Sequence, residues 1–180
     1  MQKKYDKIII VDIEATCWEG SQIEKKENEI IEIGVCLLDV QTHEISDNIG
    51  IIIKPEKSEV SEFCTKLTTL TQSQVDKGIS LKEGCEILEK KYLSKSRIWA
   101  SYGAYDLNQF TKECLKKNIT YPFSQNHINV KTLFYLKNKL KKEVGMAEAL
   151  NISKLELEGT HHRGVDDAKN IAKILIQILK

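Results

Sequence analysis

The sequence of 180 residues has the length of a single domain, 1–180, and its 41% hydrophobic and 29% charged residues are typical of a soluble globular protein. A formal net charge of +1 argues against a protein that grips a nucleic-acid duplex over a broad basic surface, because such binding depends on many phosphate contacts. Five widely spaced cysteines without a Cys-x-x-Cys pair argue against a disulfide framework and a zinc knuckle.

We expect no export signal at the start of this sequence. Residues 1–6 lead into an apolar strand without the apolar stretch of a signal peptide, and the apolar runs elsewhere are far shorter than a membrane span. We therefore expect a cytoplasmic protein with no membrane partner. Lysines cluster at 116–117 and within 137–142, and a solvated helix face is the simpler interpretation of both clusters.

The first third of the chain predicts a three-stranded antiparallel meander. The expected strands cover 7–13, 30–40 and 44–54, with a charged loop over 19–28 and a short turn at 41–43. The run from Ile8 to Val11 is apolar at every position, which predicts a strand buried on both faces and therefore central in its sheet. Pro55 is expected to end the third strand.

The rest of the chain alternates helical stripes with short strands at 97–101 and 127–130. The apolar faces of the expected helices are formed by Leu81, Cys85, Leu88 and Tyr92; by Leu107, Phe110, Cys114 and Leu115; by Leu133, Leu136 and Leu140; and by Ala168, Ile171, Ala172, Leu175, Ile178 and Leu179. Because a helix can cross over to a parallel strand, the order predicts βαβα units after the meander. The expected architecture is α/β and fits an RNase H-like fold, with a mixed five-stranded sheet covered by helices.

Two acids, Asp12 and Glu14, follow the first apolar strand directly. Residues two apart in a strand point to the same side, so both carboxylates would lie on one apolar face. At about 4 Å they would repel by roughly 4 kcal/mol at an effective dielectric near 20, and a divalent cation is the simplest relief. The alternative is that the strand stops at Val11 and both acids are solvated.

A third acid, Asp106, follows the fourth predicted strand where the chain turns into a helix. It lies four and eight residues before Phe110 and Cys114, so it would share their buried face. An acid at this point is equally well explained by the helix macrodipole, which stabilises negative charge near a helix N-terminus. Both interpretations remain open.

The closing helix contains adjacent acids, Asp166 and Asp167, about 100° apart around its axis. The stripe above Asp166 holds Asn170, Lys173 and Gln177 and is expected to be solvated, whereas the stripe above Asp167 holds Ile171, Ile174 and Ile178 and is expected to be buried. Only Asp167 then requires a functional explanation. His162, in the preceding loop, is expected to curl back toward its carboxylate, where neighbouring acids would tune the imidazole as an acid or base. A plain surface histidine is the alternative.

Four segments together resemble a known enzyme family. Residues 12–17 (DIEATC), 102–106 (YGAYD) and 162–168 (HRGVDDA) are similar, in order, to the three motifs of the DEDDh 3′-to-5′ exonucleases. Residues 61–71 (SEFCTKLTTLT) resemble a segment of the Eri-like branch, which trims RNA 3′ ends, and there it lies beside the terminal nucleotide. Two positions depart from the pattern. Thr69 replaces a usual glycine and would be strained if φ is positive, and Tyr102 replaces a frequent tryptophan.

The resemblance implies a set of catalytic residues. Asp12, Glu14, Asp106 and Asp167 would hold two Mg²⁺ or Mn²⁺ ions about 3.5 to 4 Å apart. Glu14 would therefore act in catalysis, and His162 would accept the proton of the attacking water as general base. The reaction would release 5′-mononucleotides from the 3′ end of RNA, either single-stranded or as a structured overhang.

The resemblance also implies contacts with the terminal nucleotide, to which His162 would add its ring. Ala15 and Thr16 would approach it through their backbone, while Phe63, Leu67 and Leu107 would flank its base or sugar; core packing is the alternative for these three. Trp18, at the entrance of the charged loop, would offer its ring for base stacking, typically worth about 1 to 3 kcal/mol.

Two other functions compete with an exoribonuclease. One is a catalytically inactive RNase H-like module that binds nucleic acid or protein, and the complete set of acids argues against it. The other is a DNA-directed, proofreading-type exonuclease, so DNA remains a candidate partner beside RNA. The natural RNA, the oligomeric state and any targeting partner are not indicated by the sequence.

Overall fold

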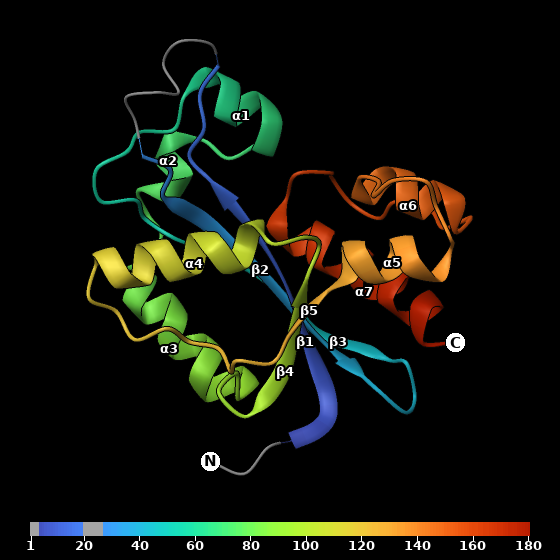
Figure 1. The fold of residues 1–180 in the computed structure, drawn as a ribbon. Helices are drawn as coiled ribbons and strands as arrows, with labels where there is room; N and C mark the ends of the chain where they lie inside the picture. The colour runs from blue at the N-terminus through green and yellow to red at the C-terminus, as the bar shows by residue number, and fades with distance from the viewer. Residues whose placement is uncertain (1–3, 20–26) are drawn as a thin grey trace.

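The computed structural model describes residues 4–19 and 27–180, and its centre is the predicted mixed sheet (Figure 1). The strands run in the order β3-β2-β1-β4-β5. Their bounds are Lys4–Ala15 for β1, Ile30–Asp39 for β2, Ile45–Ile52 for β3, Arg97–Ser101 for β4 and His127–Asn129 for β5. Most of the predicted charged loop, 20–26, lies outside the described residues.

Strand β1 is central, as its apolar run predicts. It pairs antiparallel with β2, where Ile10 lies opposite Cys36, and parallel with β4, where Ile10 lies opposite Ala100. The meander is completed by antiparallel pairing of β2 with β3, and β4 pairs parallel with β5. Both predicted parts of the sheet, the meander and the parallel crossovers, are therefore confirmed.

Helices cover both faces of the sheet (Figure 1). Helices α3 (Leu81–Tyr92) and α4 (Tyr105–Lys116) lie on one face, and α5 (Val130–Lys137), α6 (Met146–Ile152) and α7 (Gly164–Leu179) lie on the other. Two short helices, α1 (Glu62–Thr68) and α2 (Gln72–Val75), form a smaller buried cluster with Ile31 of β2. Of the described helices, none is long and apolar enough to cross a membrane.

The side chains of β1 alternate between the two cores. Ile9, Val11 and Ile13 belong to the core beneath α3 and α4, whereas Ile8 and Ile10 belong to the core beneath α7. Residues two apart share a face, so the positions after Ile10 on the α7 side are Asp12 and Glu14. The alternation thus directs both acids toward α7.

The predicted helix faces are correct for Phe110 and Cys114 of α4 but wrong for Leu115 and for much of α5. Leu115 of α4 is 82% exposed, and Leu136 of α5 is 61% exposed. Helix α5 begins directly after β5, so that Val130 and Phe134, one turn apart, are its buried residues. Helices α1, α2 and α6 are not predicted at all, because four to seven residues are too few to display helical periodicity.

Candidate active site

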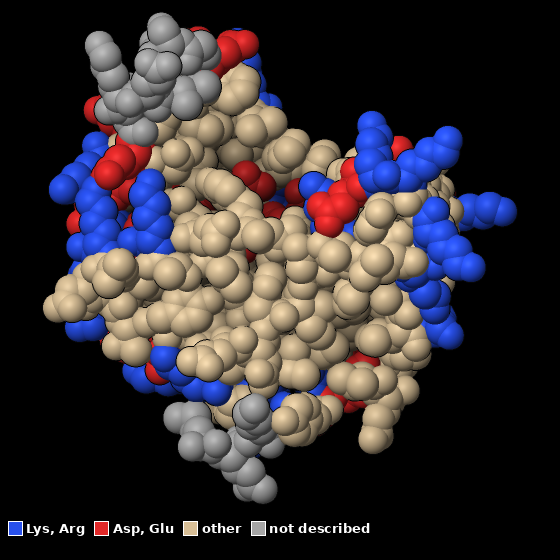
Figure 2. All heavy atoms as spheres, viewed as in Figure 1, with Lys and Arg blue, Asp and Glu red and all other residues tan. Residues whose placement is uncertain are grey.

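Three acids meet where α7 begins on the sheet. Carboxylate oxygens of Asp12, Glu14 and Asp167 all lie within 4.8 Å of one another. Figure 2 shows acidic side chains deep in a hollow between the part of the molecule formed by α1 and the part formed by α6. The predicted common face for Asp12 and Glu14 is confirmed, and so is the burial of Asp167. The alternative, in which both strand acids are solvated beyond the end of the strand, is wrong, because β1 continues to Ala15.

Two glycines allow α7 to start so close to the acids. A Cβ atom on Gly34 of β2 would lie 1.8 Å from the carbonyl oxygen of Gly164, and a Cβ atom on Gly164 would lie 2.9 Å from that of Asp12. The first residue of α7 therefore packs backbone against backbone on β1 and β2. This contact sets Asp167, one turn further on, beside the strand acids.

Asp106 joins the site from the other face of the sheet. Its Oδ1 atom accepts a hydrogen bond from the Ile13 backbone N–H at 3.0 Å. The parallel register of β1 with β4 ends at Ile10, so this N–H at the strand edge is paired by a side chain instead. Asp106 is 4% exposed and shares its buried face with Phe110 and Cys114, which confirms the phase argument.

The environment of the acids strongly favours their neutral forms. Burial, followed by the charges of Asp167 and Glu32, raises the pKa of Glu14 to about 9. Burial raises the pKa of Asp12 well above its usual range, with the Asp106 charge adding to it, and raises the pKa of Asp106 to about 6. Bound divalent cations would favour the charged carboxylates instead, because their positive charge offsets the repulsion between the acids.

The two carboxylate oxygens of Asp167 have different surroundings. Its pKa is raised by burial, although the loop before α7 donates hydrogen bonds to it. Those bonds reach Oδ2, while Oδ1 is buried and has no hydrogen-bond partner among the residues that the structure describes. Buried oxygens are rarely left unpaired, so this atom fits an oxygen ligand for a hard cation.

The loop before α7 places two histidines beside Asp167, and their contacts with it differ. The Nδ1 atom of His161 lies 3.0 Å from Asp167 Oδ2, whereas His162 donates to the same oxygen through its backbone N–H, at 2.9 Å. The two rings stack with centroids 3.9 Å apart. His162 thus lies beside Asp167, as expected from its loop, and it is held there by its backbone N–H and by the stacked ring of His161.

Burial lowers the pKa of His162 below its usual value, and the His161 charge adds to this effect while Asp167 opposes it. A lowered pKa leaves the imidazole neutral near pH 7, which is the form that can accept a proton. The position of His162 is thus compatible with the predicted general base.

The stripe above Asp166 is less solvated than expected. Asn170, one turn along α7, is fully buried, and its side chain exchanges hydrogen bonds with the Glu158 backbone. Asp166 itself accepts the Thr160 N–H at 2.8 Å, so it secures the loop that carries the histidines. The prediction fails here because the loop before α7 folds back over this stripe and covers it.

The residues expected to contact a nucleotide differ in their exposure to solvent. Thr16 is buried, and its backbone N–H donates to Glu29 O while its carbonyl accepts from Asn28. Ala15 is buried as well. Phe63 is exposed and lines a hollow of about 410 Å³, and Leu67 of the same helix is half-buried.

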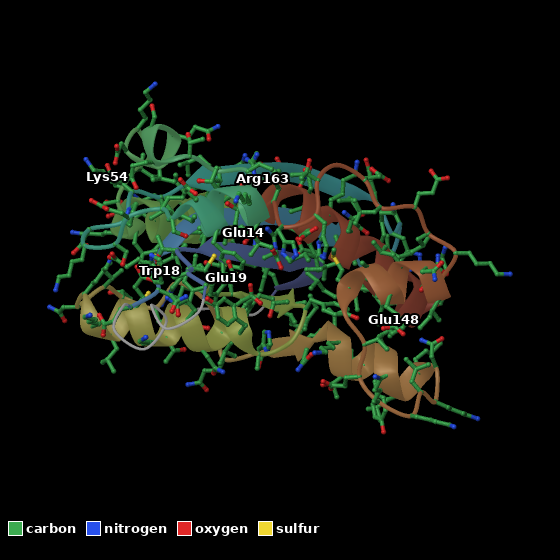
Figure 3. All side chains as sticks on the ribbon, turned by 90° about the horizontal axis from the view of Figure 1, so that it is seen from above. Glu14, Trp18, Glu19, Lys54, Glu148 and Arg163 are labelled. Atoms are coloured by element: carbon green, nitrogen blue, oxygen red, sulfur yellow. The ribbon has the colours of Figure 1, made fainter. Side chains whose placement is uncertain are left out.

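Two further candidates are turned toward α4 or the core. Leu107 is half-buried and packs against the core beneath α3 and α4. Trp18 is 6% exposed and lines a cavity of about 520 Å³ with Gln109 and Glu113 of α4 (Figure 3). The stacking of a base on Trp18 stays a prediction.

Sequence reasoning missed one charged pair at this site. Glu32 lies directly opposite Glu14 in the β1–β2 register, is fully buried, and pairs with Arg163 at 3.1 Å. The signal was present in the sequence: Glu32 interrupts an apolar strand just as Asp12 does, and a buried charge requires a partner. Its partner could not have been chosen from the sequence, because Arg163 lies 131 residues away.

Comparison with known proteins agrees with this geometry. The RNase T family model, described as an exonuclease, matches residues 9–175. The protein named 3′-5′ exoribonuclease 1 of Rattus norvegicus is 34% identical over 189 residues, which cover 98% of this chain and 54% of the rat protein. The chain thus spans about half the length of that relative. The Drosophila melanogaster protein named 3′-5′ exonuclease Snipper is 29% identical, with 98% of this chain and 70% of that protein covered.

A solved structure extends the likeness to three dimensions. The nuclease domain of 3′hExo, described as a DEDDh family member bound to rAMP, has a TM-score of 0.87 and 31% identity. The alignment covers 99% of this chain and 94% of that domain. The fold is therefore shared over almost the whole length of both.

Proposed function

Because the chain belongs to the DEDDh 3′-to-5′ exonucleases, in their Eri-like branch, we propose that it is a metal-dependent exoribonuclease that releases 5′-mononucleotides from RNA 3′ ends. The observation that carries the proposal is the convergence of four acids from three distant segments. Asp12 and Glu14 come from β1, Asp106 from α4 and Asp167 from α7. The unpaired Oδ1 of Asp167 within this cluster supports a role in metal binding.

The four carboxylates fit a pair of Mg²⁺ or Mn²⁺ ions, since hard divalent cations prefer oxygen ligands. Such ions supply positive charge that stabilises the attacking and leaving oxygens of an in-line displacement. Asp12, Glu14, Asp106 and Asp167 would hold them, and Glu14 would thereby take part in catalysis.

His162 would act as the general base. Its lowered pKa keeps the ring nitrogen free to accept the proton of the attacking water, and the backbone bond to Asp167 keeps the ring beside the acids. Phe63, exposed on α1, would flank the terminal nucleotide, with Leu67 of the same helix beside it. The acid cluster can thus act on a short stretch of RNA, which is compatible with the low net charge.

RNA is favoured over DNA as the substrate because of the relatives. The rat relative is named an exoribonuclease, and one structure described as 3′-end specific recognition of histone mRNA stem-loop by 3′-exonuclease is 31% identical with a TM-score of 0.86. The preference of this chain for RNA over DNA is part of the proposal.

Polarity and metal dependence are tested with one RNA labelled in two ways. We expect a 5′-labelled single strand to shorten stepwise in Mg²⁺, and a label in the last phosphodiester to be released at once as a mononucleotide. Chelation by EDTA should stop both reactions. Asp167→Asn should abolish turnover, while Asp166→Asn, which keeps an acceptor for Thr160, serves as the matched control.

The alternatives are outcomes of the same experiment. An RNA that stays intact under all metal and pH conditions would exclude nuclease activity and favour an RNase H-like binding module. If the 5′ label is released first, degradation runs from the 5′ end and the proposed 3′-to-5′ direction is wrong. A DNA strand of the same sequence that is degraded much faster than the RNA would favour a DNA-directed exonuclease.

A further inference from the structure

A buried ion pair anchors the histidine loop to the sheet. Arg163 donates from Nε to Glu32 Oε2 and from Nη2 to Glu32 Oε1, both at 3.1 Å. The backbone N–H of Gly164 donates to Glu32 Oε2 at 2.9 Å. Two-point pairing of a guanidinium with a carboxylate fixes orientation as well as distance. Glu32, near the start of β2, therefore holds the last residue of the loop and the first residue of α7.

These two residues immediately follow His162, whose backbone lies in the left-handed region. The φ angle of His162 is +66°. A non-glycine residue is strained in this region and persists there only where its surroundings impose it. The bond from its N–H to Asp167 restrains one side of the residue, and the Glu32 contacts restrain the other.

Arg163 lies beside the acid cluster. Its side chain is 25% exposed, and the Glu14 charge contributes to raising its pKa. Figure 3 labels Arg163 and Glu14 in the same central part of the molecule, away from Glu148 on α6. Nη1 of Arg163 also approaches Thr69 Oγ1, at 3.4 Å.

We propose that Arg163, clamped by Glu32, is a positioning residue that fixes the His162 imidazole relative to the acid cluster. The inference rests on the proposed function, in which His162 is the general base. Arg163 then acts only through His162, because its best-aligned donors are taken up by Glu32. Loss of the clamp would release the loop while leaving the four carboxylates in place.

A double-mutant cycle tests this proposal on the full chain. Arg163→Ala is expected to lower kcat by about tenfold or more, since displacing a catalytic group by 1 Å can cost about 10²-fold. The KM for a short single-stranded RNA and the affinity for Mg²⁺, measured by calorimetry, should change less than about threefold, in line with an effect on kcat alone. In a His162→Ala background, Arg163→Ala should cause almost no further loss, because the group that it positions is gone.

A matched arginine provides the control. Arg97 makes a comparable two-point pair with Asp6, at 2.7 and 3.2 Å, at the opposite end of the β1–β4 pair from Asp12. Arg97→Ala should lower the melting temperature without a selective effect on kcat at temperatures where the protein is folded. Should Arg163→Ala not fold, Arg163→Lys replaces it in the cycle, since lysine keeps the charge but not the two-point geometry.

The results separate this inference from the proposed function. If the Arg163 substitution lowers kcat as much in the His162→Ala background as in the wild type, Arg163 does not act through His162 and the positioning role is wrong. A large loss of Mg²⁺ affinity would also overturn it. If His162→Ala itself leaves turnover unchanged, the proposed general base fails instead.

Discussion

At the residue scale, two neighbouring histidines hold different places around Asp167. His161 contacts the carboxylate with its ring, while His162 contacts it with its backbone and has the lowered pKa. The ring of His162 is thus left to accept a proton, whereas the Nδ1 of His161 is engaged. The position of His162 in the third motif and the hydrogen bonds of the two histidines both favour the proposed role of His162 as general base.

We predict that His162→Ala lowers turnover by about 10² or more, the typical contribution of a general base, while Mg²⁺ affinity stays largely intact. His161→Ala should have a much smaller effect on turnover. Single-turnover rates for both variants on one labelled RNA provide the comparison. Equal losses would mean that the third motif has been aligned in the wrong register.

Thr69 shows how a single backbone angle can reveal a strained position. It ends α1 in the left-handed region, with φ +63°, and is the one β-branched residue with positive φ in the described part of the chain. The strain anticipated from the departure at this position is therefore present. Its hydroxyl gains only a long contact to Arg163, at 3.4 Å.

Thr69→Gly is predicted to raise the free energy of unfolding by about 1 kcal/mol, because glycine adopts positive φ without a Cβ clash. Urea denaturation measures the change. Thr65→Gly, inside α1, is the control and should lower stability, since glycine disfavours a helix interior. A less stable Thr69→Gly protein would show that the contact with Arg163 outweighs the strain.

At the element scale, the start of α7 decides whether the site exists. Gly34 and Gly164 let the helix approach the sheet backbone to backbone, and Asp167 reaches the strand acids only from there. A helix that starts farther from β2 would still bury its isoleucine stripe but would carry Asp167 away. Stability and site geometry therefore depend on the same contact.

Gly34→Ala is predicted to destabilise the protein by about 1 to 3 kcal/mol or more, the usual range for overpacking, and to abolish nuclease activity. The new methyl group would lie 1.8 Å from the Gly164 carbonyl oxygen, a backbone atom that cannot turn aside. Gly145→Ala is the control, because no atom of the described part of the chain lies within 4 Å of the added methyl group. Thermal unfolding and RNA digestion should distinguish the two; a fully active Gly34→Ala enzyme would refute the requirement for close packing.

Helical stripes predicted which helices exist better than which face each buries. In α7, with sixteen residues, most of the predicted apolar stripe is buried, although Asn170 is covered as well and Leu179 is 44% exposed. In α5, with eight residues, the neighbouring strand sets the phase and Leu133 and Leu136 turn outward. Short helices take their orientation from what they pack against, which lies outside their own sequence.

At the scale of the whole molecule, the acid cluster links stability to pH and to metal. The folded-state pKa of Glu14, about 9, lies far above its unfolded value of about 4, and those of Asp12, Asp106 and Asp167 are raised too. Between these values the folded state binds more protons than the unfolded state. Stability conferred by the neutral acids is complete below about pH 4 and is lost as the pH rises.

We therefore predict that the metal-free protein in EDTA loses thermal stability as the pH rises from about 5 to about 9. Mg²⁺ should raise the melting temperature most at the alkaline end, where the carboxylates must otherwise carry unpaired charge. Calorimetry with and without metal measures both effects. Glu14→Gln should flatten the pH dependence, and a metal-free wild type that gains stability with pH would contradict the raised pKa values.

The sequence by itself determined the succession of strands and main helices along the chain, the shared face of Asp12 and Glu14, and the choice of Asp167 over Asp166. These follow from local periodicity, because the period of a strand or helix fixes which neighbours share a face. Only the tertiary structure decided the burial of Trp18, the division of contacts between His161 and His162, and the pairing of Glu32 with Arg163. Those depend on surfaces that meet only after folding, and no local pattern encodes the distance between them.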